Sequence, residues 1–227
     1  MAGAGSGTEM LDVLQKQLSD IYQLGQSCDV RDYLITDPVL AKALGQGRVL
    51  GDSEETLLML QEGDEMSLSL FLDAELLQRV NCGNPMENLC ADMLDDLWKV
   101  FEGISHFNCM VWKAQQDRTV SLLELELQGE IDKYVGTMLL AMQQADTSLL
   151  HNLHGWLFDN IRFHDDLDSE QRERYRSAND YAARFCHGLK QQLLANDAVA
   201  LGQLRHFYRL QLGDKISHIH SQAIAPA

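Results

Sequence analysis

The stretch from Leu97 to Tyr134, LWKVFEGISHFNCMVWKAQQDRTVSLLELELQGEIDKY, decides the fold of this chain. Its apolar residues recur at helical spacing on both sides of a short polar break at 116–119. This pattern predicts two long helices, at about 89–115 and 120–144, joined by a tight turn. The helices also carry polar groups where a plain helical hairpin would have only Leu and Ala, so the hairpin is the first place to look for a functional site.

These polar groups follow one stripe on each predicted helix. On the first helix, Glu102, His106 and Cys109 stand at positions i, i+4 and i+7, and this spacing places them on one face. The second helix repeats the spacing, so two polar stripes can meet across the hairpin. The members of the second stripe are Glu126, Glu130 and Lys133.

The position of the turn predicts which residues of the two stripes face each other. With the turn centred near residue 117 or 118, antiparallel helices bring together positions whose numbers sum to about 235, since both helices rise equally per residue. Each polar group then has an expected partner on the other helix. The expected pairs are Glu102 with Lys133, His106 with Glu130, and Cys109 with Glu126.

Two interpretations of this cluster stay open. Imidazole and carboxylates bind divalent cations, and a carboxylate beside a histidine moves its pKa towards the range of an acid–base catalyst. Alternatively, the same groups form an interhelical network of salt bridges that determines which helix packs where. Candidates for catalysis are His106, Glu130, Glu102 and Lys133, and candidates for a metal site are His106, Glu126 and Glu130.

Known motifs narrow the functional classes. The sequence contains no Glu-x-x-His unit, which di-iron carboxylate bundles use twice, and no His-Glu-x-x-His unit of zinc proteases. The patterns GxSxG, GxxxxGK[ST] and GxGxxG are also missing. A nucleophile elbow, a phosphate-binding loop and a dinucleotide fold are therefore not expected, and no cofactor is indicated.

Composition and charge predict a mainly helical globular protein. Apolar residues make up 45% of the 227 residues, and there are only three prolines. The net charge is -16, with -12 in residues 1–101, -8 in 102–171 and +4 in 172–227. Such an acidic chain repels nucleic acid, so nucleic-acid binding is not expected.

The chain shows no signal for a membrane or an oxidising compartment. Its five cysteines form an odd set without a CxxC pair, which favours buried, reduced thiols. The first ten residues lack the basic and apolar parts of a signal peptide, and no apolar run reaches the roughly 18 residues of a spanning helix. We therefore expect a cytoplasmic protein.

The fold class predicted from these patterns is mainly helical α+β in two portions. Residues 55–72 contain two short apolar runs, and in the second run leucines alternate with other residues. This pattern predicts a β-hairpin that packs on helices or joins a strand near 30–35. Residues 81–88, NCGNPMEN, are rich in residues that end helices, and they suggest a boundary between the two portions. The expected portions are a disordered lead at 1–8, a small α+β portion at 9–85, a helical bundle at 86–213 and a frayed tail at 214–227.

Other charged groups are weaker candidates for a site. The pairs His151/His154 and His218/His220, and His164 in an acidic loop, could each bind a metal weakly. Arginines and a tyrosine near the C-terminus could hold a phosphate or an acidic segment, or could balance the acidic first half of the protein. These residues are Arg172, Arg176, Asn179, Arg205, His206, Tyr208 and Arg209.

Five stretches carry a family resemblance over most of the chain. They are DVRDYLITDP (29–38), EGDEMSLSLFLD (62–73), EGISHF (102–107), LLELELQGEIDKY (122–134) and RYRSANDYAARFC (174–186). In this order they resemble an uncharacterised family of bacterial cytoplasmic proteins. The resemblance implies a bacterial cytoplasmic origin and carries no activity, cofactor or catalytic residue.

Two functional hypotheses follow. The first is a non-enzymatic interaction or regulatory protein, whose acidic surface attracts a basic protein partner. The leucine face of its β-hairpin, if exposed, could also form a homodimer. The alternative is an enzyme, a metal-assisted hydrolase that uses the His/Glu cluster of the helical hairpin.

Overall fold

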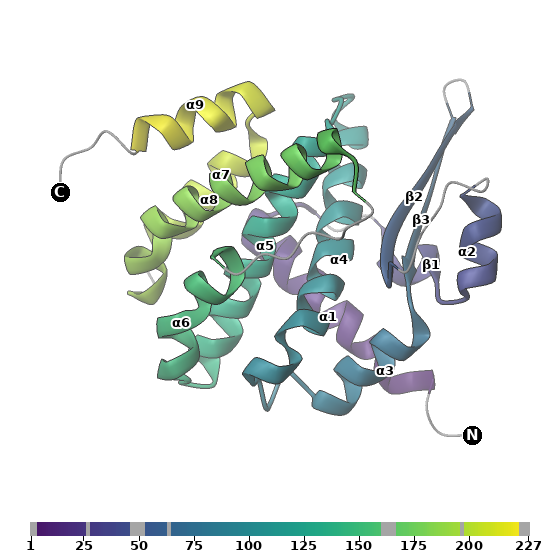
Figure 1. The fold of residues 1–227 in the computed structure, drawn as a ribbon, viewed down its shortest axis with the longest axis horizontal. Helices are drawn as coiled ribbons and strands as arrows, with labels where there is room; N and C mark the ends of the chain where they lie inside the picture. Colours follow the sequence, from purple (N-terminus) through teal and green to yellow (C-terminus); the bar gives the residue numbers. More distant parts are fainter. Residues whose placement is uncertain are drawn as a thin grey trace.

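A computed structural model describes residues 4–25, 28–45, 53–62, 65–159, 167–195 and 198–222. It shows a mainly helical α+β fold, as predicted (Figure 1). Within the described residues, no helix combines the length and the apolarity needed to cross a membrane. The helices are α1 Ala4–Tyr22, η1 Val30–Tyr33, α2 Pro38–Leu44, α3 Ala74–Gly83, η2 Ala91–Met93, α4 Leu94–Gln115, α5 Leu122–Gln143, α6 Thr147–Phe158, α7 Ser169–Leu194, α8 Ala198–Arg209 and α9 Leu212–Gln222.

The predicted helical hairpin is present as α4 and α5, and α5 is the central helix of the fold. It packs against α4, α6, α7 and α1, so most of its residues are buried (Figure 1). The register follows the prediction at two points, where Trp98 Nε1 donates to Thr137 Oγ1 at 3.1 Å and Lys133 Nζ donates to Glu102 at 3.0 Å. The buried polar residues of α5 must therefore find partners inside the protein.

A small sheet lies against α4. It consists of β1 (Leu34–Ile35), β2 (Glu55–Glu62) and β3 (Glu65–Leu72) in the order β1-β3-β2. Strands β2 and β3 are antiparallel and lie where the sequence pattern predicts a hairpin, while β1 runs parallel to β3. The alternation of β3 buries Leu68, Leu70 and Leu72 in the main core and turns Phe71 towards Ala41 of α2. The leucine face therefore lies on helices.

Both ends of the chain differ from the prediction. Helix α1 begins at Ala4 instead of after a disordered segment 1–8, and residues 1–3 lie outside the described part. The tail expected to fray from residue 214 belongs to α9, which begins at Leu212 shortly after α8 ends at Arg209. The physical reason is burial, because Lys215 and Ile219 stand four residues apart on one face of α9 and are both fully covered. Residues 223–227 lie outside the described part.

Cys109 and Cys186 are buried in the helical core, whereas Cys82 and Cys90 are exposed.

The close packing of α4 on α5 depends on Gly136. A Cβ atom at this position would lie 2.5 and 2.6 Å from two ring atoms of Phe101, which is fully buried. We expect Gly136→Ala to lower the free energy of unfolding by about 1–3 kcal/mol, because the ring has no room to move away. Chemical denaturation measures this loss.

The matched control is Gly202→Ala in α8, where no atom lies within 4 Å of the added Cβ. This change should raise stability by roughly 0.5–1 kcal/mol, since alanine favours a helix over glycine. An equal effect of the two substitutions would contradict the packing argument.

Candidate functional site

The hairpin brings most of the candidate polar residues together between α4 and α5. Lys133 Nζ donates to Glu102 at 3.0 Å, which is the predicted pair, and also to Glu130 at 2.7 Å, one turn away on its own helix. All three side chains are largely buried. Lys133 therefore holds two of the candidate carboxylates in a compact ion-pair network.

His106 does not pair with Glu130 as predicted. Its Nδ1 lies 3.8 Å from Glu55 Oε1, and its Nε2 lies 3.8 Å from Glu126 Oε2. The cause is Gly129, which precedes Glu130 on α5 and has no side chain. A Cβ at Gly129 would be only 3.1 Å from His106 Nε2, so the imidazole occupies this space instead of facing Glu130.

The pairing of Cys109 also differs from the prediction. The charged neighbours that act on its buried thiol are Lys215, Glu124, Lys113 and Asp132, and Glu126 is not among them. Burial raises the pKa of this thiol to about 11, so Cys109 stays protonated at neutral pH. The register predicts the height at which side chains meet along two helices, but it does not predict the side of the helix from which neighbours approach.

Two members of the site come from distant segments. Glu55 is the first residue of β2, and Gly103 of α4 admits it, since a Cβ there would lie 3.0 Å from Glu55 Cγ. Arg174 comes from α7, and its Nε lies 3.7 Å from Glu126 Oε1. Sequence reasoning missed both residues. The one available signal was the strand alternation, which places Glu55 on the same face as the core residue Leu57.

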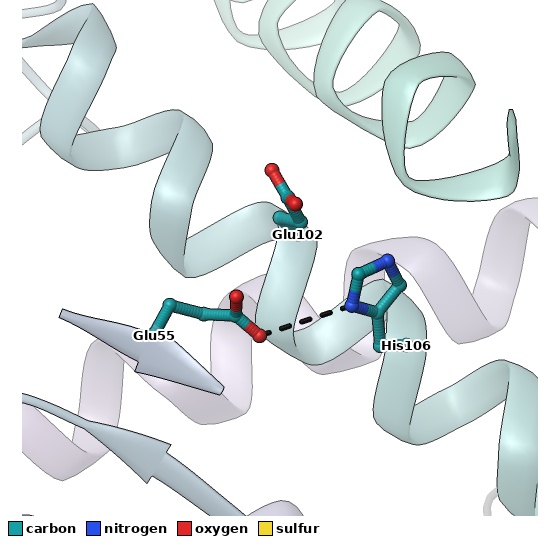
Figure 2. Close-up of side chains that lie close together, drawn as sticks. All are labelled: Glu55, Glu102 and His106. Carbon is teal, nitrogen blue, oxygen red and sulfur yellow. Dashed lines mark ion pairs between the residues drawn. The ribbon is translucent and has the colours of Figure 1, made fainter. Parts of the chain in front are cut away.

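Glu55, Glu102 and His106 form a compact group of potential metal ligands (Figure 2). One ligand atom from each residue can be chosen so that these atoms lie within 4.8 Å of one another. Metal–ligand bonds of about 2.0–2.2 Å place two ligands of one ion at most about 4.4 Å apart, so a small inward movement would complete the geometry. The structure thus assembles a site from one strand and one helix turn, using two of the predicted residues.

Two polar atoms at the centre of this group have no hydrogen-bond partner. They are Glu55 Oε1 and His106 Nε2, both buried within the described part of the protein. The separation of 3.8 Å on each side of the imidazole exceeds the usual limit of a hydrogen bond. In this respect the His106 half of the cluster differs from the Lys133 half, where the hydrogen bonds are short.

Burial and mutual charge shift the pKa values of the site. Burial alone would lower the pKa of His106, but Glu55, Glu126 and Glu102 outweigh it and raise the value to about 9. Burial, with the charges of Glu102 and Glu55, raises the pKa of Glu126 to about 7. Burial also raises the pKa of Glu130, while Lys133 and His106 hold that of Glu102 below its usual value despite burial. Glu126 is thus placed near neutrality, where a general base works best.

A second buried polar cluster lies on the other side of α5. Asp132 accepts hydrogen bonds from Tyr22 of α1, Ser105 of α4 and Gln128 of α5. Burial raises the pKa of Asp132 to about 6, although these three donors act against the shift. Gln128 also donates to the hydroxyl of Tyr22 at 3.1 Å, so the group is closed by hydrogen bonds.

Two buried lysines extend this second cluster. Glu124 accepts from Lys113 at 2.7 Å and lies 3.2 Å from Lys215 Nζ, and Lys215 also donates to Gln128 at 3.4 Å. The cluster was missed at the sequence level, although Glu124, Gln128 and Asp132 stand at i, i+4 and i+8 on α5. This spacing is a second polar stripe and could have revealed it. Its charges balance, which indicates a structural role.

The remaining candidates do not gather into a site. His154 Nε2 lies 2.9 Å from the carbonyl oxygen of Ala183, while His218 lies beside His206 with ring centroids 5.9 Å apart. His164 is outside the described residues. Arg205 donates to the carbonyl oxygen of Ile21, and Arg209 donates to that of Tyr22. Asn179 donates to the carbonyl oxygen of Phe158, and the ring of Tyr208 stacks on that of Tyr22. Arg176 forms an ion pair with Glu173 at the surface.

Arg205 and Arg209 therefore have a structural role, which differs from the two roles expected, anion binding and balancing the acidic first half of the protein. Arg205 and Arg209 bind the last carbonyl groups of α1, which have no partner within the helix. Their positive charge also stabilises the negative end of the helix dipole.

Comparisons of the chain with family models, with curated proteins and with solved structures found no match. The resemblance to an uncharacterised bacterial family therefore stays a prediction, and functional conclusions rest on the geometry alone.

The raised pKa of His106 predicts how stability depends on pH. The pKa is about 9 in the folded protein, against the ordinary value of 6.5, so the folded state binds the proton more tightly than the unfolded chain. The stabilisation is fully present below pH 6.5 and is lost as the pH rises through 9. We expect the free energy of unfolding to fall over this range by up to about 3 kcal/mol.

Urea denaturation of the metal-free protein at several pH values measures this loss. In His106→Gln the decrease between pH 6.5 and 9 should be largely absent. A variant that kept the slope of the wild type would show that other groups cause it.

Proposed function

We propose that the protein binds a divalent metal ion through Glu55, Glu102 and His106 and acts as a metal-assisted hydrolase. The observation that carries this proposal is the convergence of three ligand atoms within 4.8 Å around the orphaned Glu55 Oε1. Two carboxylates and one imidazole suit zinc or manganese. Three protein ligands leave a coordination position for water, as catalytic metal sites require.

The environment of His106 supports this assignment. His106 Nδ1, which lies beside Glu55, would bind the metal, and Nε2 faces the carboxylate of Glu126. Histidines that bind metals usually donate their second N–H to such an outer carboxylate, which orients the ring. Glu126 then belongs to the surroundings of the metal, in contrast to its predicted place as a ligand.

The charges of the site also favour a divalent cation. Of the described side chains in direct contact here, the carboxylates are Glu55, Glu102, Glu126 and Glu130. The permanent cations among them are Lys133 and Arg174. A bound divalent ion would offset the remaining two negative charges while His106 is neutral, as a ligand must be.

In the hydrolysis that we propose, water attacks the carbonyl carbon of an ester and the bond to the alcohol oxygen breaks. A bound metal would supply the Lewis acidity that makes a water molecule more acidic. The proton of this water would pass to the leaving alcohol, while Glu126 would act through the His106 N–H that it orients. Water is thereby divided between an acid and an alcohol, and no other reactant is consumed.

Metal titration tests the proposed site. Chelator-treated protein should bind one equivalent of Zn²⁺ or Mn²⁺ in isothermal titration calorimetry, and Glu55→Gln or His106→Gln should weaken binding at least tenfold, because each removes a ligand. Glu130→Gln is the matched control. This carboxylate is already held by Lys133 at 2.7 Å, so its loss should change binding by less than threefold.

Glu126→Gln tests the outer carboxylate. It should weaken metal binding by about tenfold and lower the metal-dependent hydrolysis of p-nitrophenyl acetate, because the His106 ring loses the group that orients it. A wild-type protein that binds no metal would refute the proposal. If the metal-loaded protein had no esterase activity, the proposed metal site would stand and the proposed hydrolase activity would be refuted.

A second proposal is that the protein binds another protein or a second copy of itself through α2 and β2. Apolar side chains are exposed there, among them Val39 at 75% and Leu44 at 49% on α2, and Leu60 at 38% on the face of β2 that carries Leu58 against α2. Strand β2 is also the outer strand of the sheet as described. Such a surface typically marks an interaction site.

Sedimentation velocity tests the second proposal. We expect the wild type to self-associate in the micromolar range and the double change Val39→Lys with Leu44→Lys to make it monomeric. Val199→Lys is the control, because Val199 is 53% exposed on α8, in another part of the surface. A monomeric wild type that also captures no protein at low salt would refute this role.

We also infer a two-part organisation in which residues 9–85 form a smaller portion packed on a helical bundle at 86–213. Glu55 belongs to the first portion and the other site residues to the second, so the proposed metal site lies where they meet. The free cysteines favour a cytoplasmic location, in agreement with the sequence resemblance to bacterial cytoplasmic proteins.

A further inference from the structure

A surface hollow of about 420 Å³ lies beside the proposed metal site. It is formed by the first turn of α5 and the first turns of α7. Glu126 follows Leu122 and Leu123 of the hollow by one helical turn, and Arg174 both lines the hollow and contacts Glu126. Arg174 therefore lies between the hollow and the proposed site. The lining residues are Leu122, Leu123, Glu170, Glu173, Arg174 and Ser177.

Arg174 is engaged by Glu126 and Tyr175, but one of its N–H groups has no hydrogen-bond partner among the described residues. Its buried Nε has no hydrogen-bond partner among the described residues, and its distance of 3.7 Å to Glu126 is longer than a hydrogen bond. The guanidinium carbon lies 5.3 Å from the ring centroid of Tyr175, a contact that restricts its position. A guanidinium held in this way presents N–H groups to a planar oxyanion in the bidentate geometry that arginine favours.

The charges around the hollow limit the kind of anion that fits. Glu173 is matched by Arg176 at 3.4 Å and accepts from Ser177 at 3.5 Å, so its charge is partly offset. Glu170 is exposed and would repel a multiply charged group. Leu122, 59% exposed, and Leu123 give the hollow an apolar wall. One arginine, two carboxylates and two leucines together suit a ligand with a single negative charge on an apolar group.

We propose that this hollow binds the singly charged carboxylate of an apolar organic acid or acid ester, with Arg174 holding the carboxylate. The proposal deepens the proposed hydrolase, on which it rests for the reacting centre. It names the substrate class as apolar esters that carry a free carboxylate. Arg174 positions the substrate, and the ester group extends past Glu126 towards the metal ligands.

Ligand binding to the metal-free protein tests the subsite without involving the metal. The probes are benzoate, its neutral isostere benzamide, and benzylamine, with binding followed by NMR titration. We expect benzoate to bind at least tenfold more tightly than benzamide, and benzylamine not to bind. Preference for benzylamine would show that Glu170 determines recognition, and equal binding of benzoate and benzamide would show that charge has no role. Either result overturns the proposal.

Variants of two arginines on the same helix locate the site. Arg174→Gln should weaken benzoate binding at least tenfold, and Arg174→Lys should give an intermediate loss, because lysine keeps the charge but lacks the planar fork. Arg184→Gln is the control, exposed ten residues further along the same helix and outside the lining of the hollow, and should stay within twofold of the wild type. If both variants, Arg174→Lys and Arg174→Gln, fold and bind benzoate as tightly as the wild type, Arg174 does not hold the carboxylate and the proposal is overturned.

The two proposals fail in different ways. Metal titration of the same preparation tests the ligands of the metal, whereas the benzoate titration tests only the hollow. Benzoate binding by a protein that binds no metal would remove the hydrolase and keep an acid-binding site. Metal binding without benzoate binding would remove the substrate class and keep the metal site.

Discussion

The burial of most of α5 is the constraint on which the rest of the structure depends. Fifteen of the 22 residues of this helix are buried, and among them are Glu, Gln, Asp and Lys side chains. A buried polar group without a partner costs about 1–3 kcal/mol, and a charged one costs more. Each polar residue of α5 therefore requires a partner from a neighbouring element. The arrangement of α1, α4, α9 and β2 around α5 satisfies most of these requirements.

Two polar clusters result, and they differ in how completely they are satisfied. Around Asp132 the donors are hydrogen-bonded and Lys113 and Lys215 balance Glu124 and Asp132. This cluster ties α1, α4, α5 and α9 together. Around His106 the carboxylates outnumber the cations in contact with them, and two buried atoms lack hydrogen-bond partners. Incomplete satisfaction of this kind costs stability, and it supports the proposal that the second cluster accommodates a ligand.

The two interpretations of the hairpin cluster apply to different parts of it. Lys133 with Glu102 and Glu130 forms an ion-pair network between helices, as the structural interpretation expects. His106 with Glu55 and Glu126 has the longer distances and the shifted pKa values that support the proposal of a chemical role. Glu102 belongs to both parts, since it accepts from Lys133 and also lies within the group of potential ligands. The salt bridge thereby positions one of the proposed metal ligands.

The sequence by itself determined the helical hairpin, the strands of the small sheet and the pairing of Glu102 with Lys133. These features follow from local periodicity and from the position of one turn, which a sequence records directly. The contacts of His106, the arrival of Glu55 and Arg174, and the burial of Lys215 were decided only by the tertiary structure. Two glycines without side chains, Gly103 and Gly129, leave the space that Glu55 and His106 occupy. Periodicity describes the face on which a side chain stands, whereas its neighbours depend on how distant elements pack against that face.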